Sequence, residues 1–106
     1  MIVDVRVDPA GRIEAIGLDA RACALGQASA ALLTHNAIGR TAAEMETATQ
    51  ALRAFLDGTG SDPSFWPGME VLAAARNYPA RHPSILLSFE AASEAAANAV
   101  KEMQAS

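Results

Sequence analysis

The spacing of apolar residues changes its period after residue 18, and this change limits what the chain can fold into. Residues 2–7 and residues 12–18 each alternate apolar and polar side chains, which is typical of half-buried strands. In the first segment the apolar set is Ile2 or Val3, then Val5 and Val7; in the second, Ile13 and Ala15 alternate with Arg12 and Glu14. Residues 8–11 form a turn cluster between them, so the two segments predict an antiparallel hairpin.

From Ala22 onward the spacing is helical. A first helix is predicted to about Ile38, with Gly39 as its C-cap, and a capping box at Thr41 and Glu44 begins a second helix. A loop is predicted over 58–63. A short helix follows Pro67 and is broken at 77–79, and a last helix runs from Pro83 or Ser84 to about Met103. Residues at helical spacing are predicted to share one face of each long helix. These are Leu25, Ala28, Leu32 and His35 on the first helix, Met45, Ala48, Leu52 and Phe55 on the second, and Leu87, Ala91, Glu94 and Ala95 on the last.

An isolated hairpin is marginally stable in water, so this one must lie on the helices. The order β-β-α-α-short α-α therefore predicts an α+β fold in which a small antiparallel sheet packs against a helical layer. The length of 106 residues fits a single domain over residues 1–106.

Composition excludes several classes of protein. A hydrophobic share of 51% with a net charge of −4 argues against global disorder, and the acidic balance argues against nucleic-acid binding. No apolar run is long enough for a membrane span, and the first residues do not resemble a secretory signal. One cysteine excludes an internal disulfide framework and a self-contained zinc finger, which favours a cytoplasmic protein. The 25 alanines predict a thin core that relies on close helix packing and on a partner chain.

Cys23 is the first candidate for chemistry. It lies where the second strand leads into the first predicted helix, and the amides and dipole of a helix start favour the thiolate form. A thiolate there could act as a nucleophile or a metal ligand. The alternative is that Cys23 is a buried small hydrophobe, as free cysteines often are.

Other polar residues allow similar pairs of interpretations. His82, in the loop before the last helix, is either a metal ligand or a solvent-facing histidine, and Arg81 beside it either binds an acidic partner or is solvated. His35 is interpreted as a partly exposed helix residue, and Ser84 as an N-cap. Trp66 is expected to anchor the short helix to the core.

Longer stretches resemble a known family. The segments Gly11–Glu14, Ala22–Thr34 and Ile38–Thr41 resemble the U-type iron–sulfur cluster scaffolds (the NifU N-terminal domain, IscU and SufU), with no gap in register from Gly11 to Thr41. Tyr78–Arg81 and Ile85–Phe89 resemble a later segment of the same family. The resemblance covers nearly the whole chain and implies the SufE/NifU-like fold.

The family holds zinc or a nascent cluster with three cysteines and an aspartate, and only part of this set is matched here. Cys23 matches the second cysteine, with Ala22 in place of the preceding glycine. The third cysteine falls at Ser84 in one register, or at Pro83 in another that makes His82 a family ligand. In the family, the first cysteine and the aspartate belong to a loop just before the strand that matches residues 2–7, so neither has a counterpart in residues 1–106.

The resemblance implies a scaffold that binds iron, a cluster or sulfur through Cys23, with His82 as a second metal ligand. An iron–sulfur cluster, iron or zinc is the implied cofactor, and the incomplete ligand set counts against it. The implied partner is a cysteine desulfurase that docks at Arg81. The alternatives are a zinc-dependent sulfurtransferase and a structural or regulatory module without metal. A homodimer that covers the open edge of the hairpin is also predicted.

Overall fold

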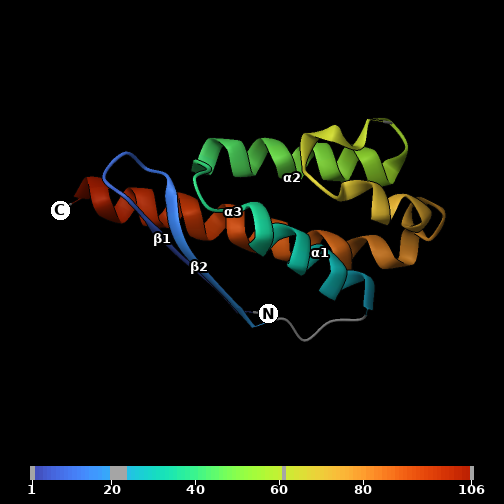
Figure 1. Ribbon diagram of the computed structural model, residues 1–106, viewed down its shortest axis with the longest axis horizontal. Helices are drawn as coiled ribbons and strands as arrows, with labels where there is room; N and C mark the ends of the chain where they lie inside the picture. The colour runs from blue at the N-terminus through green and yellow to red at the C-terminus, as the bar shows by residue number, and fades with distance from the viewer. Residues whose placement is uncertain (1, 20–23, 61, 106) are drawn as a thin grey trace.

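The computed structural model describes residues 2–19, 24–60 and 62–105 and shows a hairpin packed on helices (Figure 1). The predicted α+β class is confirmed. The elements are β1 (Ile2–Val7), β2 (Ile13–Asp19), α1 (Ala24–Asn36), α2 (Ala42–Asp57), the 3-10 segments η1 (Pro63–Phe65), η2 (Met69–Asn77) and η3 (Pro79–Arg81), and α3 (His82–Ala105). The short helix predicted after Pro67 corresponds to η2, which is a 3-10 helix, whereas η1 and η3 were not predicted as helical. Within the described residues, no helix has the length and apolar character needed to cross a membrane.

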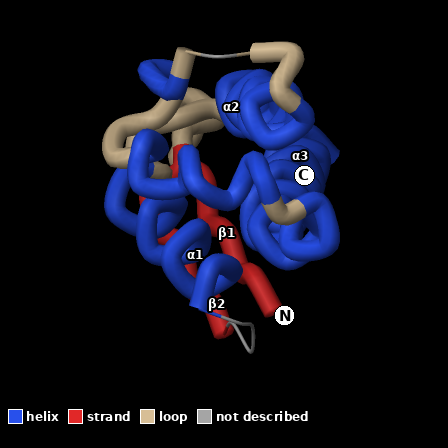
Figure 2. The backbone as a smooth tube through the Cα atoms, turned by 90° about the vertical axis from the view of Figure 1, so that its right-hand side faces the viewer, coloured by secondary structure: helices blue, strands red, loops and turns tan. Residues whose placement is uncertain are grey.

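Helix α3 is the axis of the fold. It has 24 residues and runs the length of the molecule, with α2 beside it and the hairpin crossing it obliquely (Figure 1). Seen from the side, α1, α2 and α3 stand around the strands and the η segments (Figure 2). Contacts of α3 with α1, α2 and β1 dominate the tertiary packing. Its buried face consists of Ile85, Ser88, Phe89, Ala92 and Ala96.

The predicted face of α3 is wrong, and that of α1 is confirmed in part. On α3, Leu87 and Glu94 are exposed, and the buried positions are one or two residues along the sequence from the predicted ones. On α1, Leu25, Ala28 and Leu32 pack against the core as predicted, whereas His35 is exposed. The fully buried residues of α1 are Gly26, Ser29, Ala30 and Leu33. Both helices are rich in small residues on every side, so their sequences give little contrast between faces. In α2 the predicted face is confirmed, because Met45, Ala48, Leu52 and Phe55 are all buried.

The hairpin contains a bulge that the alternation did not predict. β1 and β2 are antiparallel with Val5 opposite Ile16, and the register shifts between Arg6 and Val7. The extra residue on β2 lets both Ile13 and Ile16 pack toward the helices, in place of the predicted Ile13 and Ala15. In β1, Val3, Val5 and Val7 pack against the core and Ile2 is 62% exposed.

Gly39 does not cap α1, which ends at Asn36. It has φ of +89°, a conformation that suits glycine, and lies in the turn before α2. There its N–H donates to the Ile13 carbonyl at 2.8 Å, and the Ile13 N–H donates to the Arg40 carbonyl at 2.8 Å. These two bonds attach the start of β2 to the α1–α2 connection.

Trp66 anchors the segment between α2 and α3, as predicted. Its side chain is fully buried, and the indole Nε1–H donates to the Leu32 carbonyl at 2.8 Å. The ring lies edge-on to Phe89 with centroids 5.1 Å apart, and the Arg40 guanidinium lies 3.9 Å from its centroid. One side chain thus joins α1, the α1–α2 connection and α3.

The predicted capping box of α2 is confirmed. Thr41 is the N-cap: its Oγ1 accepts from the Glu44 N–H, and its own N–H donates to the Glu44 carboxylate, both at 3.2 Å. The Thr41 N–H and the Thr41 hydroxyl both donate to the Glu44 carboxylate, and these two bonds, helped by the charges of Arg12 and Arg40, lower the pKa of Glu44 below its ordinary value. Gly58, with φ of +83°, ends the helix.

Replacement of Trp66 should destabilise the whole fold. Trp66→Phe removes the hydrogen bond to the Leu32 carbonyl and leaves space beside Phe89, so we expect a loss of about 2–4 kcal/mol in the free energy of unfolding. Phe65→Leu, at the half-buried neighbour, should cost under about 1.5 kcal/mol. Urea denaturation measures both, and equal losses would contradict the anchoring role of Trp66.

The capping box predicts a dependence of stability on pH. The pKa of Glu44 is lower in the folded state than in the unfolded state, so its contribution is complete above about pH 5 and is lost as pH falls through the folded-state pKa. Glu44→Gln removes the charge, so the variant should be less stable than the parent at pH 7, and the difference should shrink as the pH falls below about 4. Melting temperatures across this range test the effect. Glu46→Gln, exposed on α2 outside the capping box, is the control and should show a constant small difference.

Candidate functional site

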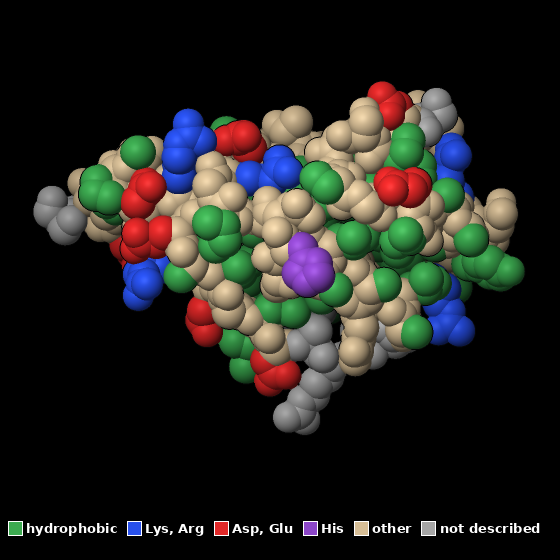
Figure 3. All heavy atoms as spheres, viewed as in Figure 1, with side chains coloured by type: hydrophobic (Ala, Val, Ile, Leu, Met, Phe, Trp, Pro, Cys, Tyr) green, Lys and Arg blue, Asp and Glu red, His purple; other side chains and the backbone are tan. Residues whose placement is uncertain are grey.

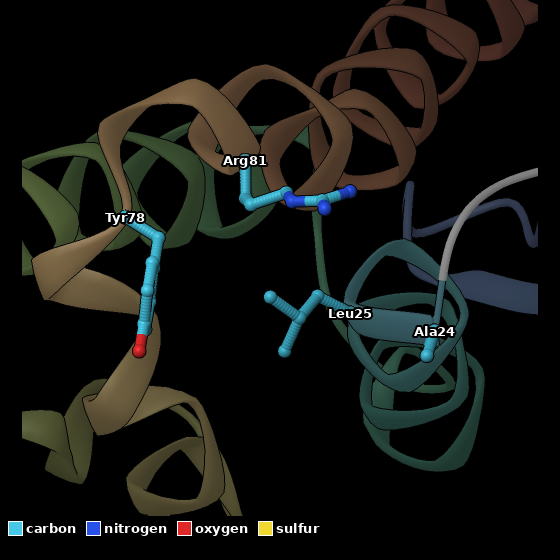
Figure 4. A pocket seen from close by; sticks show the side chains of 4 residues that line it. All are labelled: Ala24, Leu25, Tyr78 and Arg81. Carbon is cyan, nitrogen blue, oxygen red and sulfur yellow. The ribbon is translucent and has the colours of Figure 1, made fainter.

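A pocket of about 350 Å³ opens where the start of α1 faces η3, the turn just before α3. Its lining residues are Ala24, Leu25, Tyr78 and Arg81. Leu25 projects from α1 toward the side of the pocket where the Tyr78 ring hangs, and the Arg81 side chain extends above it (Figure 4). Among the described lining residues, most of the surface is apolar and Arg81 carries a positive charge. This combination suits a small anionic or sulfur-containing group, or the side chains of a protein partner.

Local sequence explains how the pocket walls are positioned. Pro79 follows Tyr78 and favours a tight turn, in which the Arg81 N–H donates to the Tyr78 carbonyl at 2.9 Å. Helix α1 begins at Ala24 and carries no acidic residue in its first turn. Its first backbone N–H groups therefore leave a positive end next to the pocket.

Cys23 precedes Ala24 in the sequence and lies outside the described residues. The pocket lining thus begins with the residue that follows the only cysteine of the chain. The structure leaves the predicted role of Cys23 untested.

His82 is the first residue of α3, and its ring is half-buried. Its Nε2 lies 2.9 Å from the carbonyl oxygen of Ala75 in η2. A neutral ring that donates from Nε2 keeps a lone pair on Nδ1. Histidines that bind metals commonly make such a hydrogen bond with the nitrogen that does not face the metal. The bond also ties η2 to the start of α3, and His82 is not among the residues that line the pocket.

Neighbouring predictions have different outcomes. Helix α3 begins at His82, so Ser84 is inside its first turn and the predicted N-cap role is wrong. Pro83 is exposed in the same turn, where the absence of an N–H has no cost. The exposed position predicted for His35 on α1 is confirmed.

Metal ligands are few around this pocket. In residues 2–19, 24–60 and 62–105, no group of three or more His, Cys, Asp or Glu side chains is placed to hold a metal ion. The whole sequence has one cysteine and two histidines. A tetrahedral thiolate-rich site needs four ligands, so one chain does not supply them.

Surface charge does not favour a polyanionic ligand. Lys and Arg side chains are interspersed with Asp and Glu over the face in Figure 3. Several cations are also engaged within the chain, such as Arg53 with Glu90 at 2.9 Å and Arg6 with Glu14 at 3.0 Å.

Comparison with solved structures identifies the fold family. No protein-family model matches the chain, and no curated protein matches it. The crystal structure of a nitrogen-fixing NifU-like protein (N-terminal) from Brucella abortus matches with a TM-score of 0.84 and 32% identity, over 93% of this chain and 69% of that one. The chain belongs to the NifU-like family. The resemblance drawn from Gly11–Thr41 is confirmed, and this NifU-like domain is related to iron–sulfur scaffold domains.

Sequence reasoning missed most of the pocket lining. Arg81 was singled out, but Tyr78 was treated only as part of a helix break, and Leu25 was placed on the buried face of α1. Tyr78 is 59% exposed, so its ring is accessible to a ligand or a partner at the pocket. A signal was available, because Tyr78 starts the Tyr-Pro-Ala-Arg segment that carried the resemblance.

Proposed function

We propose that this NifU-like domain acts in iron–sulfur cluster assembly as a carrier that accepts sulfur or iron at Cys23 and passes it on. The observation that carries the proposal is the pocket between Leu25, Tyr78 and Arg81, which begins at the residue after that cysteine. Family membership supplies the context of cluster assembly.

Sulfur transfer needs only one thiolate on the accepting protein. The Cys23 thiolate attacks the outer sulfur of a persulfide on the donor, a new S–S bond forms, and the donor S–S bond breaks. The donor cysteine leaves as a thiolate, and the outer sulfur now sits on Cys23. A persulfide carries negative charge near neutral pH, which the Arg81 guanidinium and the positive end of α1 would stabilise.

A stable cluster is less compatible with this chain. The sequence supplies one thiolate, at Cys23, and His82 offers its Nδ1 as a second ligand when its Nε2 donates to the Ala75 carbonyl. Half of a four-ligand set would hold iron or a cluster weakly, which suits a donor of cargo rather than a storage site. The same shortage counts against the zinc-dependent sulfurtransferase.

A second candidate function is a structural or regulatory module of the same fold. The small number of ligands favours it, because partner binding needs no metal. If the chain is such a module, the exposed Tyr78 and the positive charge of Arg81 would serve only to dock a protein.

The role of Cys23 can be tested by sulfur and metal content. We expect anaerobic protein incubated with a cysteine desulfurase, cysteine and iron to gain up to one sulfane sulfur per chain, detected by intact mass. Cys23→Ser should gain none, because it lacks the thiolate. Sulfur loading that is equal in both proteins, or absent from the parent, would overturn the carrier proposal and leave the module.

The docking role of Arg81 can be tested by charge reversal. If a cysteine desulfurase meets the pocket through acidic groups, Arg81→Glu should weaken its binding at least about tenfold. Lys101→Glu makes the same charge change near the other end of α3 and should change binding less than about twofold. Isothermal titration calorimetry measures both, and equal effects would show that net charge, not this pocket, governs binding.

A further inference from the structure

A separate cavity of about 270 Å³ lies where the end of α2 meets the end of η2. The described residues of its wall are Leu56, Asp57, Gly58, Ala73, Arg76 and Asn77. None of them lines the pocket beside α1. The two elements meet at the end of the molecule opposite the C-terminus (Figure 1). The volume is slightly below that of pockets for drug-sized ligands, so the cavity suits a smaller molecule.

The guanidinium of Arg76 is held at this cavity without an anionic partner. Its Cζ lies 5.0 Å from the centroid of the Phe55 ring, and its Nη2 would lie 3.8 Å from a Cβ added to Gly58. Its Nε is buried and has no hydrogen-bond partner, and no carboxylate of the described residues forms an ion pair with the group. A buried polar group without a partner is uncommon in a folded protein. The positive charge of Arg76 is thus available to a ligand through its terminal nitrogens.

Asp57 adds a negative charge to the same wall. It is the last residue of α2, and the last turn of that helix carries no basic residue. The Asp57 carboxylate therefore lies at the negative end of the helix dipole, where a cation is favoured. The side chain is exposed and forms no ion pair within the part of the chain that the structure describes, not even with Arg76.

We propose that this cavity binds a free α-amino acid, with its carboxylate on the terminal nitrogens of Arg76 and its ammonium group beside Asp57. Two opposite charges that line one cavity without pairing leave room between them for a molecule that carries both. A guanidinium fork matches a carboxylate with two parallel hydrogen bonds, and the Asp57 carboxylate accepts from an ammonium group. The exposed amide of Asn77 on the same wall offers a further donor and acceptor.

The pair of charges favours a zwitterion over a simple ion. A lone anion would be attracted by Arg76 but repelled by Asp57 and by the negative end of α2. A lone cation would be attracted by Asp57 but repelled by Arg76. An α-amino acid meets both charges with the matching group, and the apolar surface of Leu56 and Ala73 is left for its side chain.

This binding site goes beyond the proposed carrier function and does not depend on it. Because the cavity and the pocket beside α1 share no described lining residue, Asp57→Asn should load sulfur at Cys23 as the parent does. Failure of either proposal is therefore distinguishable from failure of the other.

The test is a titration with L-alanine, followed by the backbone amide signals of Gly58 and Asn77 in two-dimensional NMR at constant ionic strength. Both signals should shift and saturate with a Kd of about 1 to 10 mM. Acetate and methylammonium each carry one of the two charges and should bind at least about tenfold more weakly than L-alanine.

Two neutralising variants test the two charges. Arg76→Gln and Asp57→Asn should each weaken L-alanine binding at least about tenfold. The matched controls are Arg53→Gln and Glu46→Gln, which remove one charge of each sign from parts of α2 outside the cavity, and each should change binding less than about twofold. Circular dichroism and thermal melting show whether each variant is folded. Asp57 is exposed, so Asp57→Asn keeps the test decisive even if loss of the Arg76 contact with Phe55 unfolds the other variant.

Three results would overturn the proposal. One is the absence of any shift at Gly58 and Asn77 with L-alanine up to about 50 mM. Another is acetate that binds as tightly as L-alanine, which would make the cavity a plain anion site. The third is L-alanine binding that Asp57→Asn leaves unchanged.

Discussion

The buried indole of Trp66 is the contact on which the rest of this structure depends. Its N–H binds the Leu32 carbonyl of α1 and its ring lies edge-on to Phe89 of α3. Aromatic residues make up only 5% of the chain, and Trp66 is the largest fully buried side chain among the described residues. The chain continues from Trp66 into η2 and η3, so the position of Tyr78 and Arg81 follows from where the indole is held.

Small residues allow α1, α2 and α3 to pack closely against one another. Ser29 of α1 donates to the Ile85 carbonyl of α3 at 2.7 Å, and Thr49 of α2 approaches the Phe89 carbonyl at 3.3 Å. These hydroxyl groups are buried and have partners, so they join helices without an unsatisfied polar group. Ala92 and Ala96 lie on the same face of α3 and let its neighbours come near. An alanine-rich chain thereby adds the close approach of its helices to the packing of its larger core side chains.

The NifU-like fold of this chain does not rely on a metal for its core. The buried cluster consists of aliphatic, aromatic and thioether side chains, and the ring of His82 is bonded to the Ala75 carbonyl. Function rests on the site rather than on the fold. The described lining of the pocket beside the start of α1 is mostly apolar and includes the Arg81 guanidinium, a combination that suits a small anionic group or the side chains of a protein partner.

Local patterns in the sequence determined the elements. Alternation predicted both strands, the turn at 8–11 joined them, and the Thr41–Glu44 capping box set the start of α2, because each signal acts within a few residues. The motif from Gly11 to Thr41 also predicted the family. The candidate residues Arg81 and His82 were found from their place before the last helix, whereas the neighbours that complete the pocket were not.

Tertiary structure decided what local patterns leave open. The buried faces of α1 and α3 depend on which neighbours they meet, and alanine-rich helices lack the contrast that would reveal this in advance. The bulge that turns Ile16 inward reflects the attachment of Ile13 to the Arg40 carbonyl, a contact 27 residues away along the chain. The meeting of Leu25 with Tyr78 at one pocket likewise requires the whole packing of η2 and η3 under Trp66, which no short segment encodes.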